Sequence, residues 1–144
     1  MNRTKASIDQ LGNRTSYTYD VLGRQISVQD ALNHITTTTY LATGQVQARI
    51  DALGNRTTYA YDVVGRNTSV TDPLNRVTST VYNSGGQVSA NVDALGNRTS
   101  YTYDAIGNQT AVKDALGNRT STVYDAVGQT TAQVNALNYR TSFS

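Results

Sequence analysis

Cysteine, tryptophan and glutamate are missing from this 144-residue chain, and proline, phenylalanine, methionine and histidine occur once each. Without cysteine, neither a disulfide framework nor a thiolate metal site can form. No apolar run is long enough to span a membrane, so we expect no membrane span. The first twelve residues contain no apolar segment of the kind that signal peptides carry.

Charge is also scarce, because only 15% of the residues are charged and the net charge is +2. This balance is too weak to favour nucleic acid as a partner, and we expect none. What the chain has instead is threonine, valine and ten tyrosines, a composition typical of β-strands. We therefore predict an all-β protein with a thin core made mainly of Tyr, Val and Leu.

A 21-residue repeat runs through the sequence without insertions. We assign 1–8 to the end of a preceding repeat, 9–134 to six tandem repeats, and 135–144 to a truncated seventh. The six repeats start at residues 9, 30, 51, 72, 93 and 114. Self-similarity at this period indicates a repeat architecture, in which each unit depends on its neighbours to bury its own apolar surface.

Strict alternation inside each repeat predicts β-strands. In 98–104, Thr99, Tyr101 and Tyr103 alternate with polar residues, and a short turn ending in Gly107 leads to a return strand. The segment DALGN then supplies turn residues before the next repeat. The sequence thus predicts tandem 21-residue β-hairpins that form a continuous twisted antiparallel sheet of roughly thirteen strands.

The positions that carry this architecture are one Tyr, the Asp that often follows it, and one Gly in each repeat. They are Tyr19, Asp20, Gly23, Tyr40, Gly44, Tyr61, Asp62, Gly65, Tyr82, Gly86, Tyr103, Asp104, Gly107, Tyr124, Asp125 and Gly128. We expect these tyrosines to pack as a ladder along the sheet, and the Asp at the start of each repeat to cap its turn. We also expect Asp20 to pair with Arg14 across the hairpin, and Asp62 with Arg56.

Residues that could perform chemistry are few, and each recurs in copies. The single histidine, His34, occupies a turn place that Asn or Arg fills in other repeats, and the repeat offers it no special partners. A calcium ladder is conceivable, but each turn provides only one Asp. We therefore predict no catalytic residue, no metal site, no cofactor and no enzymatic activity.

The motif GNRTSYTYDAIGNQT, 96–110, resembles the YD repeats of the Rhs family, which also occur in Tc-toxin shell components and teneurins. The family pattern of Tyr-x-Tyr-Asp followed by Gly-Arg matches fully at Tyr17 to Arg24 and at Tyr59 to Arg66. The repeats at 30 and 72 depart from it, because Leu41 and Asn83 stand where Asp belongs. This resemblance implies a β-strip of a secreted or cell-surface protein, whose family members wind such strips into shells that often enclose a toxin.

The principal functional hypothesis is a non-enzymatic shell or spacer segment of a larger Rhs-type protein. Its partners would then be neighbouring repeats of the parent chain, with a possible toxin cargo in that parent. One alternative is a self-assembling filament, since near-identical sheet ends could pair with copies of the chain. A second alternative is a carbohydrate- or cell-wall-binding module that uses the tyrosine-bearing face.

Overall fold

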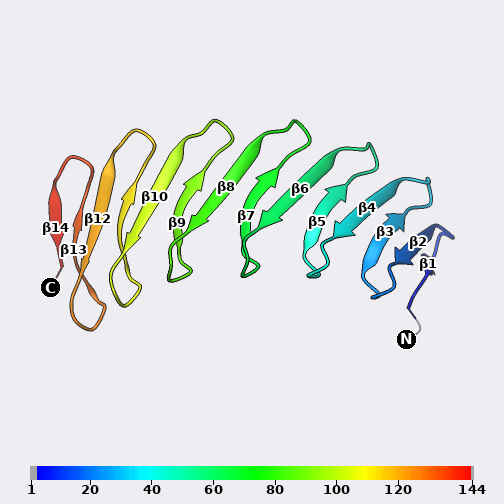
Figure 1. Cartoon of the computed structure of the whole chain (residues 1–144), viewed down its shortest axis with the longest axis horizontal. Helices are drawn as coiled ribbons and strands as arrows, with labels where there is room; N and C mark the ends of the chain where they lie inside the picture. Colours follow the sequence, from blue (N-terminus) through cyan, green and yellow to red (C-terminus); the bar gives the residue numbers. More distant parts are fainter. Residues whose placement is uncertain (1–2, 144) are drawn as a thin grey trace. The chain divides into compact units, whose positions relative to one another are not determined.

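The computed structural model describes residues 3–143, and residues 1–2 and 144, at the outer ends of the predicted first and last segments, lie outside them. The chain divides after Arg76 into two compact units. Each unit is built from short antiparallel strands joined by turns. Within the described residues no segment is helical, and none could span a membrane as a helix. The prediction of an all-β fold made of tandem hairpins is confirmed (Figure 1).

The first unit is a meander in which each strand pairs with the strands next to it along the chain. Its strands are β1 (Ala6–Ile8), β2 (Arg14–Tyr19), β3 (Gln25–Gln29), β4 (Ile35–Tyr40), β5 (Val46–Ile50), β6 (Arg56–Tyr61) and β7 (Asn67–Thr71). The six-residue strands are formed by the alternating segments of the repeat. The five-residue strands are the return strands that pair with them.

The second unit repeats this arrangement with the same strand lengths and pairing. Its strands are β8 (Val77–Tyr82), β9 (Val88–Val92), β10 (Arg98–Tyr103), β11 (Gln109–Lys113), β12 (Arg119–Tyr124), β13 (Thr130–Val134) and β14 (Arg140–Ser142). Each six-residue strand shifts register at its last residue, the repeated tyrosine, for example between Thr102 and Tyr103. Such a bulge increases local twist and changes the direction of the chain entering the turn.

Five-residue loops connect the strands, in two sets. The tyrosine-side loops follow the repeated Tyr and cover 20–24, 41–45, 62–66, 83–87, 104–108 and 125–129. The leucine-side loops carry the repeated Leu and cover 9–13, 30–34, 51–55, 72–76, 93–97, 114–118 and 135–139. These loops alternate along the chain, so the two sets lie at opposite ends of the strands.

The predicted core of Tyr, Val and Leu is wrong, because the only buried apolar side chains of the described residues are four alanines: Ala48, Ala90, Ala111 and Ala132. They occupy one repeat position in the middle of the return strands, where Ser27 and Ser69 stand in the other repeats. The leucines fail as core residues because they sit at loop tips, where Leu11 and Leu116 are 88% and 89% exposed. Within each unit a strand contacts only its sheet neighbours, so no second layer covers those loops.

Enlarging a central alanine tests this packing. Ala90 lies directly between Val81 of β8 and Ser100 of β10 and is 0% exposed. We expect Ala90→Leu to lower the free energy of unfolding by about 1–3 kcal/mol, because a larger side chain at a filled site forces its neighbours apart. Urea unfolding followed by circular dichroism measures this. Ala90→Ser is the control, since Ser27 and Ser69 fill this place naturally, and an equal loss in both variants would contradict the packing argument.

Candidate functional site: the carboxylate-capped loops and the links between hairpins

The same five-residue loop occurs at both ends of the strands, and in most copies a carboxylate at its first residue holds it closed. In 62–66 the Asp62 Oδ1 atom accepts hydrogen bonds from the backbone N–H groups of Val64, at 3.1 Å, and Arg66, at 2.9 Å. On the leucine side, Asp51 Oδ1 accepts from the N–H groups of Leu53 and Asn55, both at 2.9 Å. The predicted capping by the repeat-initial Asp is therefore present, and the tyrosine-side Asp performs the same task.

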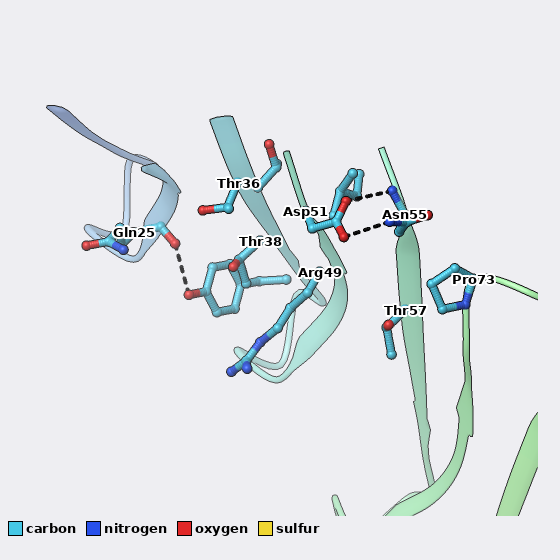
Figure 2. A pocket seen from close by; sticks show the side chains of 11 residues that line it. Gln25, Thr36, Thr38, Arg49, Asp51, Asn55, Thr57 and Pro73 are labelled. Atoms are coloured by element: carbon cyan, nitrogen blue, oxygen red, sulfur yellow. Dashed lines mark hydrogen bonds between the residues drawn. The ribbon is translucent and has the colours of Figure 1, made fainter. Parts of the chain in front are cut away.

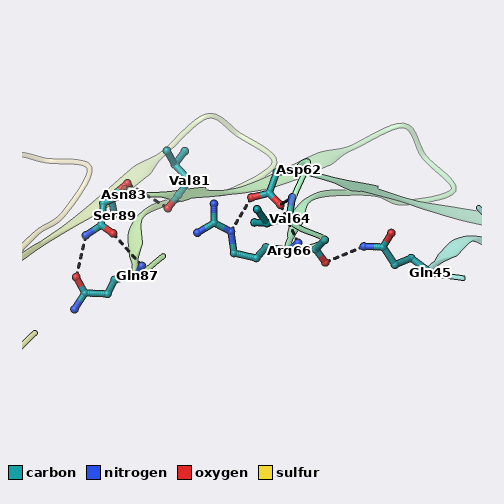
Figure 3. Close-up of polar contacts among 9 residues, drawn as sticks. Gln45, Asp62, Val64, Arg66, Val81, Asn83, Gln87 and Ser89 are labelled. Atoms are coloured by element: carbon teal, nitrogen blue, oxygen red, sulfur yellow. Dashed lines mark hydrogen bonds and ion pairs between the residues drawn. The ribbon is translucent and has the colours of Figure 1, made fainter. Parts of the chain in front are cut away.

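The fifth loop residue completes the cap by donating its side chain to the second carboxylate oxygen. Asn55 Nδ2 lies 2.8 Å from Asp51 Oδ2 (Figure 2). Arg66 Nε lies 2.7 Å from Asp62 Oδ2 (Figure 3). His34 takes the same place, with its Nδ1 atom 2.8 Å from Asp30 Oδ2. Asn83 replaces the carboxylate in 83–87, where its Oδ1 accepts from the N–H of Gln87 at 3.0 Å.

The expected pairs of Asp20 with Arg14 and of Asp62 with Arg56 are wrong. Asp20 binds Arg24 instead, with 2.6 Å between Oδ2 and Nε, and Asp62 binds Arg66 in the same way. Arg14 begins β2, and Asp20 follows its last residue, so six residues of extended chain, on the order of 20 Å, separate the two. Arg24 belongs to the same tight loop as its carboxylate and reaches it without crossing the hairpin.

The repeated tyrosines connect each hairpin to the one before it. The Oη atom of Tyr40 donates to the carbonyl oxygen of Gln25 at 3.0 Å, and that of Tyr61 donates to Val46 at 2.9 Å. Equivalent bonds reach back 15 residues from Tyr19, Tyr103 and Tyr124. Each of these phenols therefore bonds the backbone of the segment before its own strand, at the tyrosine-side ends of the strands. The packing of the rings as a ladder stays a prediction.

A second set of links runs forward, and sequence reasoning missed it. Gln45 Nε2 donates to the carbonyl oxygen of Gly65 at 2.9 Å (Figure 3). Gln87 Nε2 donates to that of Gly107 at 3.2 Å. Arg24 bonds the carbonyl oxygen of Leu41 at 3.0 Å and lies 4.6 Å from the centre of the Tyr40 ring. The sequence contains a signal for these links, because the residue after the repeated Gly is always Arg, Gln or Asn, whose side chains can donate hydrogen bonds.

Gly65, the repeated glycine of the loop 62–66, is required for two reasons. Gly65 has a φ of +91°, and a side chain there would meet Gln45 Nε2 at 3.0 Å. Gly54, on the leucine side, has a φ of +84°, but no neighbouring atom lies within 4 Å of the place that a Cβ would take. The predicted glycines Gly23, Gly44, Gly65, Gly86, Gly107 and Gly128 all have positive φ and occupy the fourth place of a tyrosine-side loop.

The carboxylates of the loops are held in their charged form. The pKa values of Asp9, Asp51, Asp72, Asp93 and Asp114 are lowered chiefly by hydrogen bonds from the side chain of the fifth loop residue. Partial burial raises the pKa values of Asp20, Asp62 and Asp104, but hydrogen bonds from the fifth loop residue and the loop backbone outweigh it. Among the described residues no group of three or more His, Cys, Asp or Glu side chains could hold a metal ion.

Comparison with known proteins identifies the repeat. A family model described as RHS Repeat matches residues 2–40, 40–77 and 82–120, which together make up most of the chain. The chain belongs to the RHS repeat family. No protein of curated function matches it significantly in sequence.

Tc toxin components are among the solved structures of similar fold. A mutant Tc holotoxin pore from Photorhabdus luminescens superimposes with a TM-score of 0.64 at 21% identity over 85% of this chain. A TcdB2–TccC3 crystal structure gives 0.56 at 19% identity, and the same complex without its hypervariable C-terminal region gives 0.57 at 20%, each over 90% of this chain. In all three, the chain spans only 7% of the length of the matched chain.

A comparison of Gly65 with Gly54 separates the contribution of the forward link from the strain of a positive φ. We expect Gly65→Ala to destabilise the protein more than Gly54→Ala, because both strain a positive φ, at about 1–2 kcal/mol, and only the first disturbs the bond to Gln45. Urea unfolding of both variants measures the difference. Equal losses would show that the forward link contributes nothing.

Acid provides an independent test of the caps. An Asp whose pKa is lowered in the folded state stabilises the fold at pH values above its unfolded pKa of about 3.9. This stabilisation is lost as the pH falls through the folded pKa. We expect the urea midpoint to stay level from neutral pH to about pH 5 and to fall below about pH 4. Asn135 accepts the same two loop N–H bonds at 3.0 Å, so Asp51→Asn with Asp93→Asn should keep the fold and weaken the acid dependence. A midpoint that rises on acidification would contradict this assignment.

Proposed function

We propose that this chain is a non-enzymatic structural segment of a larger secreted or cell-surface RHS-repeat protein, in which it forms part of a shell or spacer. The observation that carries the proposal is the direction of its side-chain bonds. The tyrosine-side loop 41–45 accepts a link from Arg24 of the hairpin before it and, through Gln45, provides one to the hairpin after it. Such a unit can be extended without limit by adding copies.

The comparisons support this role through the size and nature of the matched chains. The solved structures of similar fold are parts of Tc toxin assemblies, and this chain corresponds to 7% of each matched chain. The proposed wall segment would therefore work together with many further repeats and, in a shell, would help to enclose a toxin. No catalytic step belongs to the proposal, because the loop carboxylates and His34 are engaged in caps.

A deletion in the parent protein distinguishes a shell from a spacer. Removing 51–92 takes out two whole repeats and keeps the phase of the loops. If the segment is part of an enclosing wall, we expect an enclosed C-terminal cargo to become sensitive to added protease while the remaining repeats stay folded. Unchanged protection of the cargo would favour the spacer. Replacing 51–92 by 93–134, which restores the length, is the control and should restore protection.

Filament formation is the alternative that a specific observation favours. Within the described residues β1 pairs only with β2, and β14 only with β13, so each has an unpaired edge. Strand edges of this kind can add a strand from another molecule. Negative-stain electron microscopy of the purified chain decides between the two: discrete short particles support the wall or spacer role, and long fibrils would replace it with self-assembly.

A further inference from the structure

One cross-strand pair in the second unit brings two positive charges together. Lys113, the last residue of β11, lies directly opposite Arg119, the first residue of β12. Directly opposed residues share a face of the sheet, and like charges at such a pair are destabilising. In the other repeats that carry an arginine at this place, its partner is aliphatic: Ile8 opposes Arg14, Ile50 opposes Arg56, Val92 opposes Arg98 and Val134 opposes Arg140. The chain thus accepts here a repulsion that its other repeats avoid, and natural proteins break such local rules mainly at functional sites.

Arg98, the first residue of β10, adds a third positive charge on the same face. Lys113 lies opposite Ser100 of β10, and Arg98 stands two residues before Ser100, so the alternation of a strand places all three side chains on one face. Arg98 is oriented there, because its Nε atom donates to Ser100 Oγ at 3.2 Å. Since neighbouring strands are about 4.8 Å apart, β10, β11 and β12 present the three cations over roughly 10 Å of sheet.

A hollow of about 590 Å³ lies beside these side chains, at the leucine-side ends of the strands. Arg98, Ser100 and Lys113 line it together with residues of the two loops 93–97 and 114–118. The Lys113 side chain extends over the second of these loops, since its Cε atom lies 3.9 Å from the place that a Cβ on Gly117 would take. The glycine therefore leaves room for the lysine, and the hollow has space for a small ligand between the loops.

The three cations lack a neutralising partner within residues 3–143. All three side chains are exposed, and no carboxylate in this part of the chain forms an ion pair with any of them. Asp114 lines the hollow, but its Oδ1 atom accepts from the N–H groups of Leu116 and Asn118, and its Oδ2 atom from Asn118 Nδ2 at 2.8 Å. One capped carboxylate thus stands against three positive charges, and the hollow keeps an excess of positive charge.

The donors of this hollow suit joined phosphate groups better than a carboxylate. A guanidinium binds phosphate through two parallel hydrogen bonds, and a lysine binds it as a compact charge. The Ser100 hydroxyl accepts from Arg98 and keeps its own hydrogen to donate to a ligand. Cations on three neighbouring strands can contact two joined phosphates at once, whereas a single carboxylate brings one negative charge against three positive ones.

We propose that this hollow binds a diphosphate group, whose negative charge lies between Lys113 and Arg119 and whose second phosphate is bound by Arg98 and Ser100. The site does not depend on the wall or spacer role, because neither the tyrosine bonds nor the forward links of the loops use these four residues. Affinity should fall with rising salt, since the contacts are ionic and solvent-exposed.

Calorimetric titration with inorganic pyrophosphate tests the site, with poly-aspartate as the comparator for a polyanion without phosphate. We expect pyrophosphate to bind and poly-aspartate to bind at least about tenfold more weakly, a difference of about 1.4 kcal/mol. Lys113→Gln copies Gln29, which fills this repeat position in the first unit, and should weaken pyrophosphate binding by about tenfold or more. No binding of pyrophosphate, equal binding of poly-aspartate, or an unaffected Lys113→Gln variant would each overturn the proposal.

Urea unfolding gives a second readout of the same site. Lys113→Gln removes the repulsion from Arg119, so without pyrophosphate its urea midpoint should lie above that of the unaltered protein. Pyrophosphate should raise the midpoint of the unaltered protein, because a ligand that binds only the folded state stabilises it, and should leave that of the variant almost unchanged. Equal shifts in both proteins would show that the anion binds elsewhere.

The repeats themselves supply the matched control. Arg56 holds the repeat position of Arg119 but lies opposite Ile50, and Ile35 fills this position in another repeat. Arg119→Ile should therefore fold normally and weaken pyrophosphate binding by about tenfold, whereas Arg56→Ile should leave the affinity unchanged. Equal losses in the two variants would reduce the effect to net charge and overturn the assigned location.

A parallel titration with ADP identifies the source of the diphosphate. Tighter binding of ADP than of pyrophosphate, lost in Lys113→Gln, would support the site with a nucleoside diphosphate as its ligand. Equal or weaker binding of ADP would support it with the free anion, because the recognised group is then the diphosphate alone.

Discussion

The carboxylate at the head of most five-residue loops is the interaction on which the sheet depends. It accepts two backbone N–H bonds and one side-chain bond, as Asp51 does from Leu53 and Asn55, and so fixes the path of the whole loop. Loop length and geometry set the register of the strands on either side. Because both ends of the strands use the same five-residue loop, and most copies carry this cap, one device places most strands beside their neighbours.

A sheet without a covering layer needs stabilisation from within its own plane. In each unit the buried apolar side chains are alanines in the middle of return strands, which contribute far less burial than a packed core. The hydrogen bonds between hairpins compensate for this small burial, because every hairpin has neighbouring hairpins in the sheet. Tyr61 reaches back to Val46, and Gln45 reaches forward to Gly65, so two links join the same pair of hairpins in opposite directions. The bonds to neighbouring repeats thus take the place of a core.

Sequence reasoning succeeded where the determinants were local. The hairpins, the glycines with positive φ and the Asp caps follow from residues within a few places of one another, and the resemblance to YD repeats indicated the family that the comparisons show. It failed where burial depends on a second layer: Leu11 is apolar and regularly repeated, yet exposed, because nothing in its unit packs on the loop. It also failed for Asp20, since alternation alone does not show that a loop neighbour four residues away is nearer than the other end of the strand.

Two periods coexist in this chain, and they separate structural from surface constraints. The residues that tie hairpins together, such as Tyr40 and Gly65, recur every 21 residues, because each hairpin must meet its neighbour in the same way. The cross-strand pair in the middle of each hairpin, such as Tyr17 with Val28, has a period of 42 residues. It alternates between Tyr with Val and Thr with a polar partner, such as Thr38 with Arg49. Neither the bonds of the repeated tyrosines nor the forward links of the loops use this pair, although Asn91 Nδ2 donates to Tyr101 Oη at 3.3 Å, so the identity of the pair can change without disturbing those links. Variation is therefore tolerated at this pair, where the polar partner, Arg49, Asn91 or Gln133, differs at each occurrence.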